Sequence, residues 1–420
     1  MNSVPGDGAP AAGQSGAGQI DVPAAALARF TDDEVARLLV LRRELHRHPE
    51  LSWQERATAD RLAAAVETLG GEVARVAGTG VVARFRGRDP KGPVVAVRGD
   101  IDALPIQEET GLAYASTVPG VMHACGHDVH ATWAIGAAMD LVRRPARGDV
   151  LVVLQPAEEV GAGAPAILAS GALDGVAAIF GGHVDRRFAV GQVVAEPGPL
   201  AASADTFTIT LTGRGAHGAR PHESADPVVA AAAVITALQT IVARRLDPAF
   251  PAVCTVGSVH AGVAPNVIPE TATLTGTLRA MDPATRRRLG EELTRLATAI
   301  AAAHGVRADV AVELGTPPIV NPEREAAWAR RAATAVLGEG AVVPFGITNM
   351  GGEDFAFYME RIPGCFMRIG AREAGGEAVA AHSPRFHAAD GAILVGAAVL
   401  AECARVASEE LASEELASGR

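Results

Sequence analysis

The chain has 420 residues, 49% of them hydrophobic, so it can bury a sizeable core, and we expect two domains rather than one. Its formal net charge of -11 is spread along the sequence, which argues against a nucleic-acid partner. The four cysteines form no CxxC pair, no uncharged apolar run reaches about 18 residues, and the N-terminus lacks a secretory signal. These features argue against a disulfide framework and a membrane partner, and they predict a cytoplasmic protein.

The first 25 residues are rich in Ala, Gly, Pro and Ser. They predict a flexible tail, because they carry too few large apolar groups to offset the entropy of ordering. From Thr31, an acidic turn followed by apolar residues at helical spacing predicts a helix that ends at HRHPE, where proline stops it. A second helix is expected from Thr58 to Leu69.

Three short apolar runs that end in polar residues follow, namely PVVAVRGDID, GDVLVVLQP and GVAAIFGGHV, with a helical stretch from His127 to Arg143 between the first two. Buried strands alternating with helices predict an α/β domain with a mostly parallel sheet covered on both faces. Ligands bind beyond the carboxyl ends of the strands in such sheets. Here those ends carry Asp100, Asp102, Glu158, Glu159 and His183.

The segment from about Ser203 to Leu314 has a different order of elements: strand, helix, strand, strand, helix, strand. That order predicts a ferredoxin-like α+β domain. Since strand and helix signals of the first kind return afterwards, we expect this domain to be inserted in the larger one. The predicted boundaries are residues 26–200 and 316–412 for the larger domain, 201–315 for the inserted domain and 413–420 for a terminal tail.

The segment MHACGHDVHAT places Cys125, His127 and His130 just before a helix. Thiolate and imidazole are good ligands for zinc, manganese or cobalt. A buried cysteine beside histidines that merely cap a helix is the alternative. In LQPAEE, Glu158 and Glu159 follow a buried strand directly, and adjacent acids repel unless a cation lies beside them. A solvated acidic turn is the alternative there.

His183 in GGHVD and His382 in HSPRFH complete a set of candidate ligands at strand ends and loops. Each histidine alone could be a structural residue. Taken together, the set has about the number of ligands that two metal ions need; its members are Cys125, His127, Glu159, His183 and His382. Asp100 and Asp102 alternate along a strand end, where a carboxylate behind a ligating histidine fixes its tautomer.

A series of motifs follow one another along the sequence. They are LRRELHRHPELSWQE, GDIDALPIQEETG, MHACGHDVHAT, LQPAEE, TGRGAHGARPHESADPV, APNVIPE, GTLRAMD, MGGEDFAFY and HSPRFH. In these motifs the chain resembles the M20 metallopeptidase family. It is most similar to the aminoacylase-like branch of hippurate hydrolases, N-acyl-amino-acid deacylases and auxin-conjugate hydrolases. The resemblance implies a site for two divalent metal ions (manganese, zinc or cobalt), with Cys125, His127, Glu159, His183 and His382 as ligands. It also implies that Glu158 is the general base and that Asp102 orients a histidine from behind.

The resemblance further implies that the inserted domain is a lid and a dimerisation surface, so that the protein is a homodimer. His217 would stabilise the oxyanion, either in its own chain's site or across the dimer interface, and Asn266 and Arg279 would hold the free carboxylate of the substrate. Judged by periodicity alone, these are loop, turn and strand residues without a role. One departure from the family pattern is His387, which stands where the family has an aspartate.

The predicted function is hydrolysis of the amide bond of a small N-acyl amino acid or short peptide. A dipeptidase or carboxypeptidase, or an enzyme that cleaves carbamoyl groups, would use the same activated water. A non-catalytic, metal-stabilised binding protein is the alternative from another class. The presence of Glu158, His217 and the full ligand set argues against it.

Overall fold

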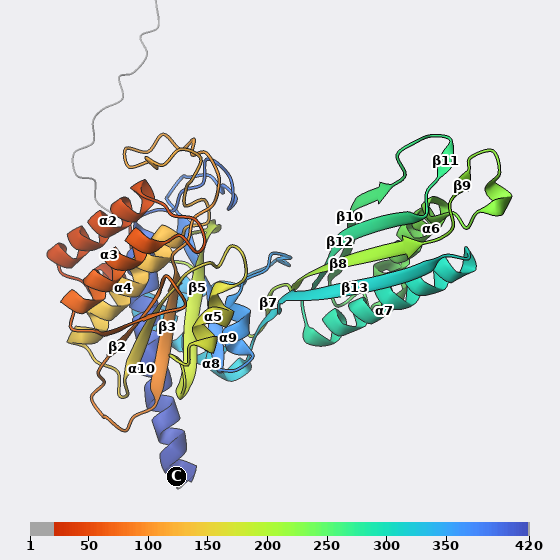
Figure 1. Ribbon diagram of the computed structural model, residues 1–420. Helices are drawn as coiled ribbons and strands as arrows, with labels where there is room; N and C mark the ends of the chain where they lie inside the picture. Colours follow the sequence, from red (N-terminus) through yellow and green to blue (C-terminus); the bar gives the residue numbers. More distant parts are fainter. Residues whose placement is uncertain (1–20, 419–420) are drawn as a thin grey trace, which may run out of the picture.

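The computed structural model describes residues 21–418 and has two lobes joined by a narrow connection (Figure 1). The larger lobe is built from the two ends of the chain, and the smaller lobe from its middle. Residues 1–20 of the predicted tail lie outside the described residues. A short helix, α1 (Ala24–Leu27), already begins within the predicted tail, and Ala26 is fully buried.

A seven-stranded sheet forms the centre of the larger lobe, in the order β1-β2-β4-β3-β5-β15-β6. Its strands are β1 (Glu72–Val76), β2 (Gly80–Phe85), β3 (Val94–Asp100), β4 (Val150–Gln155), β5 (Val176–Ala189), β6 (Val193–Val194) and β15 (Gly364–Arg372). The four central strands β4, β3, β5 and β15 run parallel, whereas β1, β2 and β6 join antiparallel at the edges. The predicted α/β class with a mostly parallel central sheet is confirmed.

Helices cover both faces of this sheet, as a buried parallel sheet requires. One face packs against α2 (Asp32–Arg47), α3 (Arg56–Thr68), α4 (His127–Arg143), α8 (Glu323–Leu337) and α10 (Gly391–Ser418). The other face packs against α5 (Gly163–Ala169) and α9 (Phe355–Met359). Thr31 caps α2 through a capping box with Glu34, so this helix begins where the sequence predicted.

The inserted lobe has the predicted βαββαβ order, and its four-stranded antiparallel sheet runs β10-β12-β8-β13. Its elements are β8 (Ala204–Thr212), α6 (Pro227–Thr240), β10 (Ala252–Ala261), β12 (Thr271–Ala280), α7 (Pro283–Ala303) and β13 (Arg307–Thr316). Helices α6 and α7 bury one face of the sheet in a core of their own. Strands β7 (Gly198–Ala201) and β14 (Ile319–Asn321) pair where the chain crosses between the lobes, and a small ribbon of β9 (Ala216–His217) and β11 (Val267–Ile268) lies at the far tip (Figure 1).

Some elements differ from the sequence-based expectation. The first helix of the inserted lobe ends as a regular α-helix at Thr240 and continues as a π-helical turn, Ile241–Arg245, which the sequence pattern did not indicate. The edge strand β1 and its neighbour β2 were not predicted. Helix α10 runs to Ser418, through residues that were predicted as a tail, because Ala, Glu and Leu in SEELASEEL favour helix.

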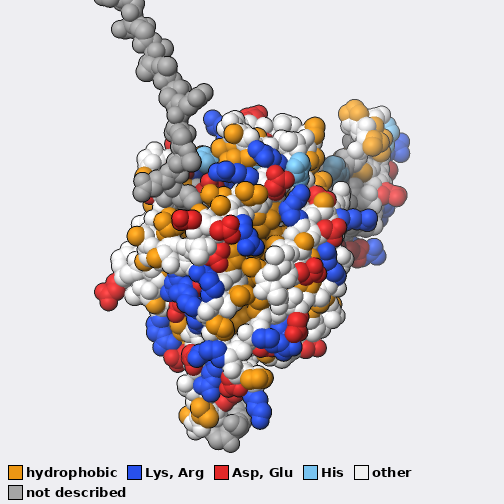
Figure 2. Space-filling model, turned by 90° about the vertical axis from the view of Figure 1, so that its left-hand side faces the viewer, with side chains coloured by type: hydrophobic (Ala, Val, Ile, Leu, Met, Phe, Trp, Pro, Cys, Tyr) orange, Lys and Arg blue, Asp and Glu red, His pale blue; other side chains and the backbone are white. Residues whose placement is uncertain are grey.

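Two described helices are long and apolar enough to cross a membrane by length and composition alone, Pro227–Arg245 and Gly391–Ala417. The apolar stretch of the second is 83% buried, so its hydropathy reflects its place in the core of the larger lobe. The first is only 33% buried, and Val228 and Val229 on α6 are exposed. On the face drawn in Figure 2, basic and acidic side chains are interspersed and form no continuous basic patch.

Candidate active site

A cavity of about 620 Å³ lies at the carboxyl ends of the central strands, where the two lobes meet. The larger lobe contributes the candidate ligands Cys125, Glu159, His183 and His382, together with Glu158, and the inserted lobe contributes Arg279. The sheet edge that the sequence predicted as the place of chemistry therefore carries the cavity.

His127 is the first residue of α4, and the backbone before it turns sharply. Gly126 has a φ of 93°, and a Cβ there would collide with Val184, so the turn needs glycine. The ring Nδ1 of His127 donates to the backbone oxygen of Asp102 at 2.9 Å and lies 3.1 Å from its carboxylate. This fixes the tautomer that leaves a lone pair on Nε2. Asp102 therefore lies behind His127, as predicted.

The Nε2 atom of His127 is buried and has no hydrogen-bond partner among residues 21–418. It lies 3.8 Å from Oε2 of Glu158 and 3.8 Å from Oε1 of Glu159, and the latter oxygen is also buried without a partner. Buried polar atoms are normally hydrogen-bonded, so unpartnered atoms facing one another need an explanation. A cation between them would satisfy both.

His183 presents a second lone pair to the same region. Its Nδ1 donates to the backbone oxygen of Val184 at 2.7 Å, and its Nε2 lies 3.1 Å from Sγ of Cys125. His382 lies with its Nε2 3.4 Å from Oε2 of Glu159. The backbone of His382 is left-handed, with a φ of 66°, and its N–H donates to Ala124 beside Cys125. Four of the predicted ligands thus line the cavity, and the fifth, His127, lies directly behind them in shared ligand sets.

The donor groups fall into sets whose atoms lie within 4.8 Å of one another. One set is Cys125, His127 and His183, and another is Cys125, Glu159 and His382. Burial, aided by Glu159, raises the pKa of the Cys125 thiol well above its usual range. A metal ion would reverse this by stabilising the thiolate. The mixture of thiolate, imidazole and carboxylate fits zinc, manganese or cobalt.

His130 is not brought to the cavity as a ligand. Its Nδ1 donates to Asp100 at 2.6 Å, and its Nε2 accepts the backbone N–H of Val184 at 3.0 Å, so both ring nitrogens are occupied. Trp133 stacks on the ring at 4.4 Å. His130 therefore has a structural role, which was the alternative to metal binding.

A buried ion network lies behind Glu158; the family resemblance of GGEDFAFY had placed Glu353 and Asp354 near the site, but their pairing with Arg98 was not predicted. The guanidinium of Arg98 donates to Glu353 at 3.1 Å and to Asp354 at 3.0 Å, and it also pairs with Asp100. Burial, with Glu353 adding to it and Arg98 opposing it, raises the pKa of Asp354 to about 7. The GGEDFAFY motif was the available signal for this network.

Burial, together with Glu353 and Asp354, raises the pKa of Glu158 well above its usual range. Its Oε1 accepts the backbone N–H of Asp354 at 3.4 Å, and its other oxygen faces His127. The carboxyl group is therefore fixed in position at the cavity wall and is disposed to bind a proton.

The three residues predicted on the inserted lobe lie in two places. Arg279, on β12, lines the cavity. His217 and Asn266 are exposed residues of the β9 and β11 ribbon, where the Gly218 N–H donates to the Asn266 backbone oxygen at 2.8 Å. This ribbon lies at the tip remote from the larger lobe (Figure 1), so one chain does not bring His217 to its own cavity. His387 lies 3.3 Å from Glu373.

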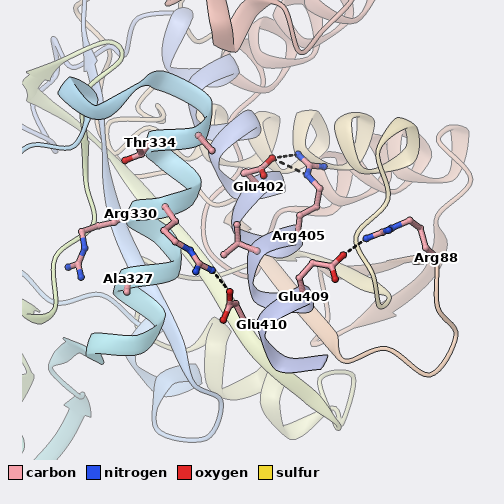
Figure 3. A pocket seen from close by; sticks show the side chains of 11 residues that line it. Arg88, Ala327, Arg330, Thr334, Glu402, Arg405, Glu409 and Glu410 are labelled. Atoms are coloured by element: carbon pink, nitrogen blue, oxygen red, sulfur yellow. Dashed lines mark hydrogen bonds and ion pairs between the residues drawn. The ribbon is translucent and has the colours of Figure 1, made fainter. Parts of the chain in front are cut away.

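A larger groove of about 870 Å³ lies between α8 and α10 (Figure 3). Its charged side chains neutralise one another: Arg331 donates to Glu410 at 2.7 Å, and Arg88 pairs with Glu409 (Figure 3). None of its lining residues belongs to the metal-ligand sets found among residues 21–418. The chemistry is therefore assigned to the smaller cavity.

The model of peptidase family M20/M25/M40 matches residues 96–406 of this chain. The N-acetylcysteine deacetylase of Bacillus subtilis (strain 168) is 40% identical over 379 residues, which cover 89% of this chain and 98% of that protein. The IAA-amino acid hydrolase ILR1-like 2 of Arabidopsis thaliana is 36% identical over 389 residues, 91% and 88% of the two chains.

The fold is also similar to a solved structure, that of the YXEP protein of Bacillus subtilis, a dinuclear metal binding peptidase from the M20 family. The TM-score is 0.81 at 38% sequence identity, and the match covers 90% of this chain and 99% of that one. The matches extend over most of the chain, and the ligand groups at the cavity are those that a dinuclear metal site needs. This chain therefore belongs to peptidase family M20/M25/M40 and is a metal-dependent amidohydrolase.

Proposed function

We propose that this enzyme hydrolyses the amide bond of N-acyl amino acids, with Glu158 as the group that moves the proton. The observation that carries the proposal is the meeting of buried, unpartnered ligand atoms with a fixed carboxyl group at one cavity wall. The deacetylase and the amino acid hydrolase that this chain resembles are named for reactions of the same class.

Two divalent ions, manganese, zinc or cobalt, are the proposed cofactors. They would be held by Cys125, His127, Glu159, His183 and His382. Bound divalent ions lower the pKa of water and polarise a carbonyl oxygen. Asp102 supports this role by orienting His127, and it is itself fixed by the Ser52 hydroxyl at 2.7 Å and the Glu159 N–H at 3.1 Å.

Glu158 is proposed to accept a proton from the attacking water and to return it to the leaving nitrogen. Two observations support this role. Its carboxyl group is anchored by the Asp354 N–H, so one oxygen stays free to face the reacting atoms. Its raised pKa, caused by burial and by the neighbouring carboxylates, favours proton uptake at that oxygen.

Arg279 is proposed to hold the free carboxylate of the substrate, because it is the cation that the inserted lobe contributes to the cavity. His217 and Asn266 would act from a second copy of the chain, His217 on the oxyanion and Asn266 on the carboxylate. A homodimer through the inserted lobe is supported by Val228, Val229 and other exposed apolar side chains of that lobe, and by the open edge of β10.

The four cysteines are free and buried, which supports the proposed cytoplasmic location.

A dipeptidase, a carboxypeptidase or a carbamoyl hydrolase is the second candidate, since the related structure is described as a peptidase. The test is free-amine release from N-acyl amino acids, dipeptides and N-carbamoyl amino acids, measured on metal-stripped protein before and after addition of manganese, zinc or cobalt. We expect metal-dependent amine release that is fastest from the N-acyl amino acids. Faster release from dipeptides or carbamoyl compounds would replace the proposal by the second candidate.

A further inference from the structure

Arg368 lies on β15, in the wall of the catalytic cavity, and the sequence motifs assign it no role. Its Cα is in register with that of His183 on the parallel neighbour β5, so both side chains point to the same face of the sheet. The residue is only 8% exposed. A guanidinium therefore lies beside a candidate metal ligand in the wall of the cavity.

This guanidinium has no acidic partner. No carboxylate oxygen of residues 21–418 lies within ion-pair distance of Arg368, and its buried Nε has no hydrogen-bond partner. The two acids that raise its pKa, Asp185 and Glu353, are engaged elsewhere: Asp185 accepts from Arg187 at 2.9 Å, and Glu353 accepts from Arg98 at 3.1 Å. Phe345 and Phe366 flank it, with ring centres 5.9 Å and 5.8 Å from its central carbon.

The other buried arginines of the described chain are all paired. Arg42 donates to Asp128 at 3.0 Å, Arg98 to Asp354 at 3.0 Å, and Arg186 to Glu373 at 2.7 Å. A buried charge is costly unless it is paired, and burial lowers the pKa of Arg368 accordingly. Its partner must therefore come from outside the described chain, and the cavity is the open side.

The planar guanidinium matches a carboxylate in a two-point contact. The cavity holds a second arginine, Arg279, to which the carboxylate common to all N-acyl amino acids has been assigned. We infer that the preferred substrate carries a second carboxylate and that Arg368 binds it. This inference rests on the proposed function. The second carboxylate could belong to the acyl group or to the side chain of the amino acid.

The test uses the full-length, metal-loaded enzyme and three substrates that differ in one carboxylate. N-acetylmethionine has none beyond the common one, N-acetylglutamate has a second one on the amino acid, and N-succinylmethionine has it on the acyl group. We expect one of the last two to have at least about tenfold higher kcat/KM than N-acetylmethionine, because a charge-assisted contact is worth about that factor or more. The favoured substrate shows whether Arg368 binds a carboxylate on the amino acid or one on the acyl group.

The matching variant is Arg368→Gln, with Arg368→Lys as the conservative change. Arg368→Gln should raise KM for the favoured dicarboxylate by about 10- to 100-fold while N-acetylmethionine stays within about threefold. Arg368→Lys should recover part of the loss. Arg372→Gln is the matched control, because this arginine lies on the same strand, β15, but does not line the cavity. It should leave all three substrates unchanged.

The outcomes separate this inference from the proposed function. If the enzyme releases amine from none of the three substrates or from any other N-acyl amino acid, the proposed function fails. If N-acetylmethionine is hydrolysed as well as both dicarboxylates, or if Arg368→Gln slows all three by the same factor, the proposed function stands and the inference is wrong. Inhibition supplies a second readout: glutarate should inhibit hydrolysis of N-acetylmethionine more strongly in the wild type than in Arg368→Gln.

Discussion

Replacing Glu158 by Gln isolates proton transfer from the rest of the site. Gln has the same shape, and its side-chain oxygen can still accept the Asp354 N–H that lies 3.4 Å from Glu158. The ligand atoms of His127 and Glu159 are unchanged. The loss should therefore be that of a general base alone, about 10²- to 10⁴-fold in kcat, or about 2.7–5.4 kcal/mol in the activation barrier.

The assay is steady-state amine release together with metal analysis of the same preparation. Glu159→Gln is the matched variant, because the adjacent carboxylate lies within 4.8 Å of Cys125 and His382 in a ligand set. Glu158→Gln should keep its metal and lose turnover, whereas Glu159→Gln should lose metal. Turnover of Glu158→Gln within about tenfold of the wild type, or loss of metal from that variant, would refute the assignment of the base.

Three further predictions follow from the structure. Cys125→Ala should lose one of two metal ions with the fold retained by circular dichroism, and two ions per chain by elemental analysis would show that Cys125 is not a ligand. His46 is buried, which lowers its pKa, but Asp128 and Glu108 outweigh burial and raise the pKa to about 9. Its stabilising effect is thus complete below about pH 6.5 and is lost as the pH rises through about 9, so the stability difference between the wild type and His46→Asn, measured by urea unfolding, should shrink over that range. A constant difference would show that His46 does not titrate in this way. Phe207→Ala removes a buried ring from the core of the inserted lobe and should cost about 3–5 kcal/mol. If the inserted lobe is an independent domain, calorimetry should show one lowered transition beside an unchanged one; a single shifted transition would contradict independence.

The larger domain and its candidate ligands could be predicted because their signals are local. Parallel strands bring their carboxyl ends to one edge, so Asp102, Glu159 and His183 could be placed together from three separate apolar runs. The βαββαβ order of the inserted lobe was likewise readable from strand and helix signals in sequence. These parts of the fold could be predicted because each strand or helix is indicated by the residues of its own segment.

The remaining features depend on contacts between distant parts of the chain. Arg98 and Asp354 meet across 256 positions, and neither segment predicts the other. The edge strand β1 is mostly exposed and lacks a continuous apolar run, and β2, which is buried, has only the short run Gly80–Ala83 before Arg84. Arg368 resembles an ordinary residue of the strand GCFMRIG, and its lack of a partner is visible only once its neighbours are placed. Periodicity did not place His217 relative to the cavity, since its position depends on how the lobes are arranged, and only the family resemblance raised an action across the dimer interface.

The most direct test of the central claim, a metal-dependent amide hydrolase of N-acyl amino acids, is a metal titration of stripped enzyme during amine release. Activity should be absent without metal, rise with bound manganese, zinc or cobalt, and saturate at two ions per chain. Full activity of protein shown to be metal-free, or no activity of folded protein loaded with two ions on any N-acyl amino acid, would contradict the claim.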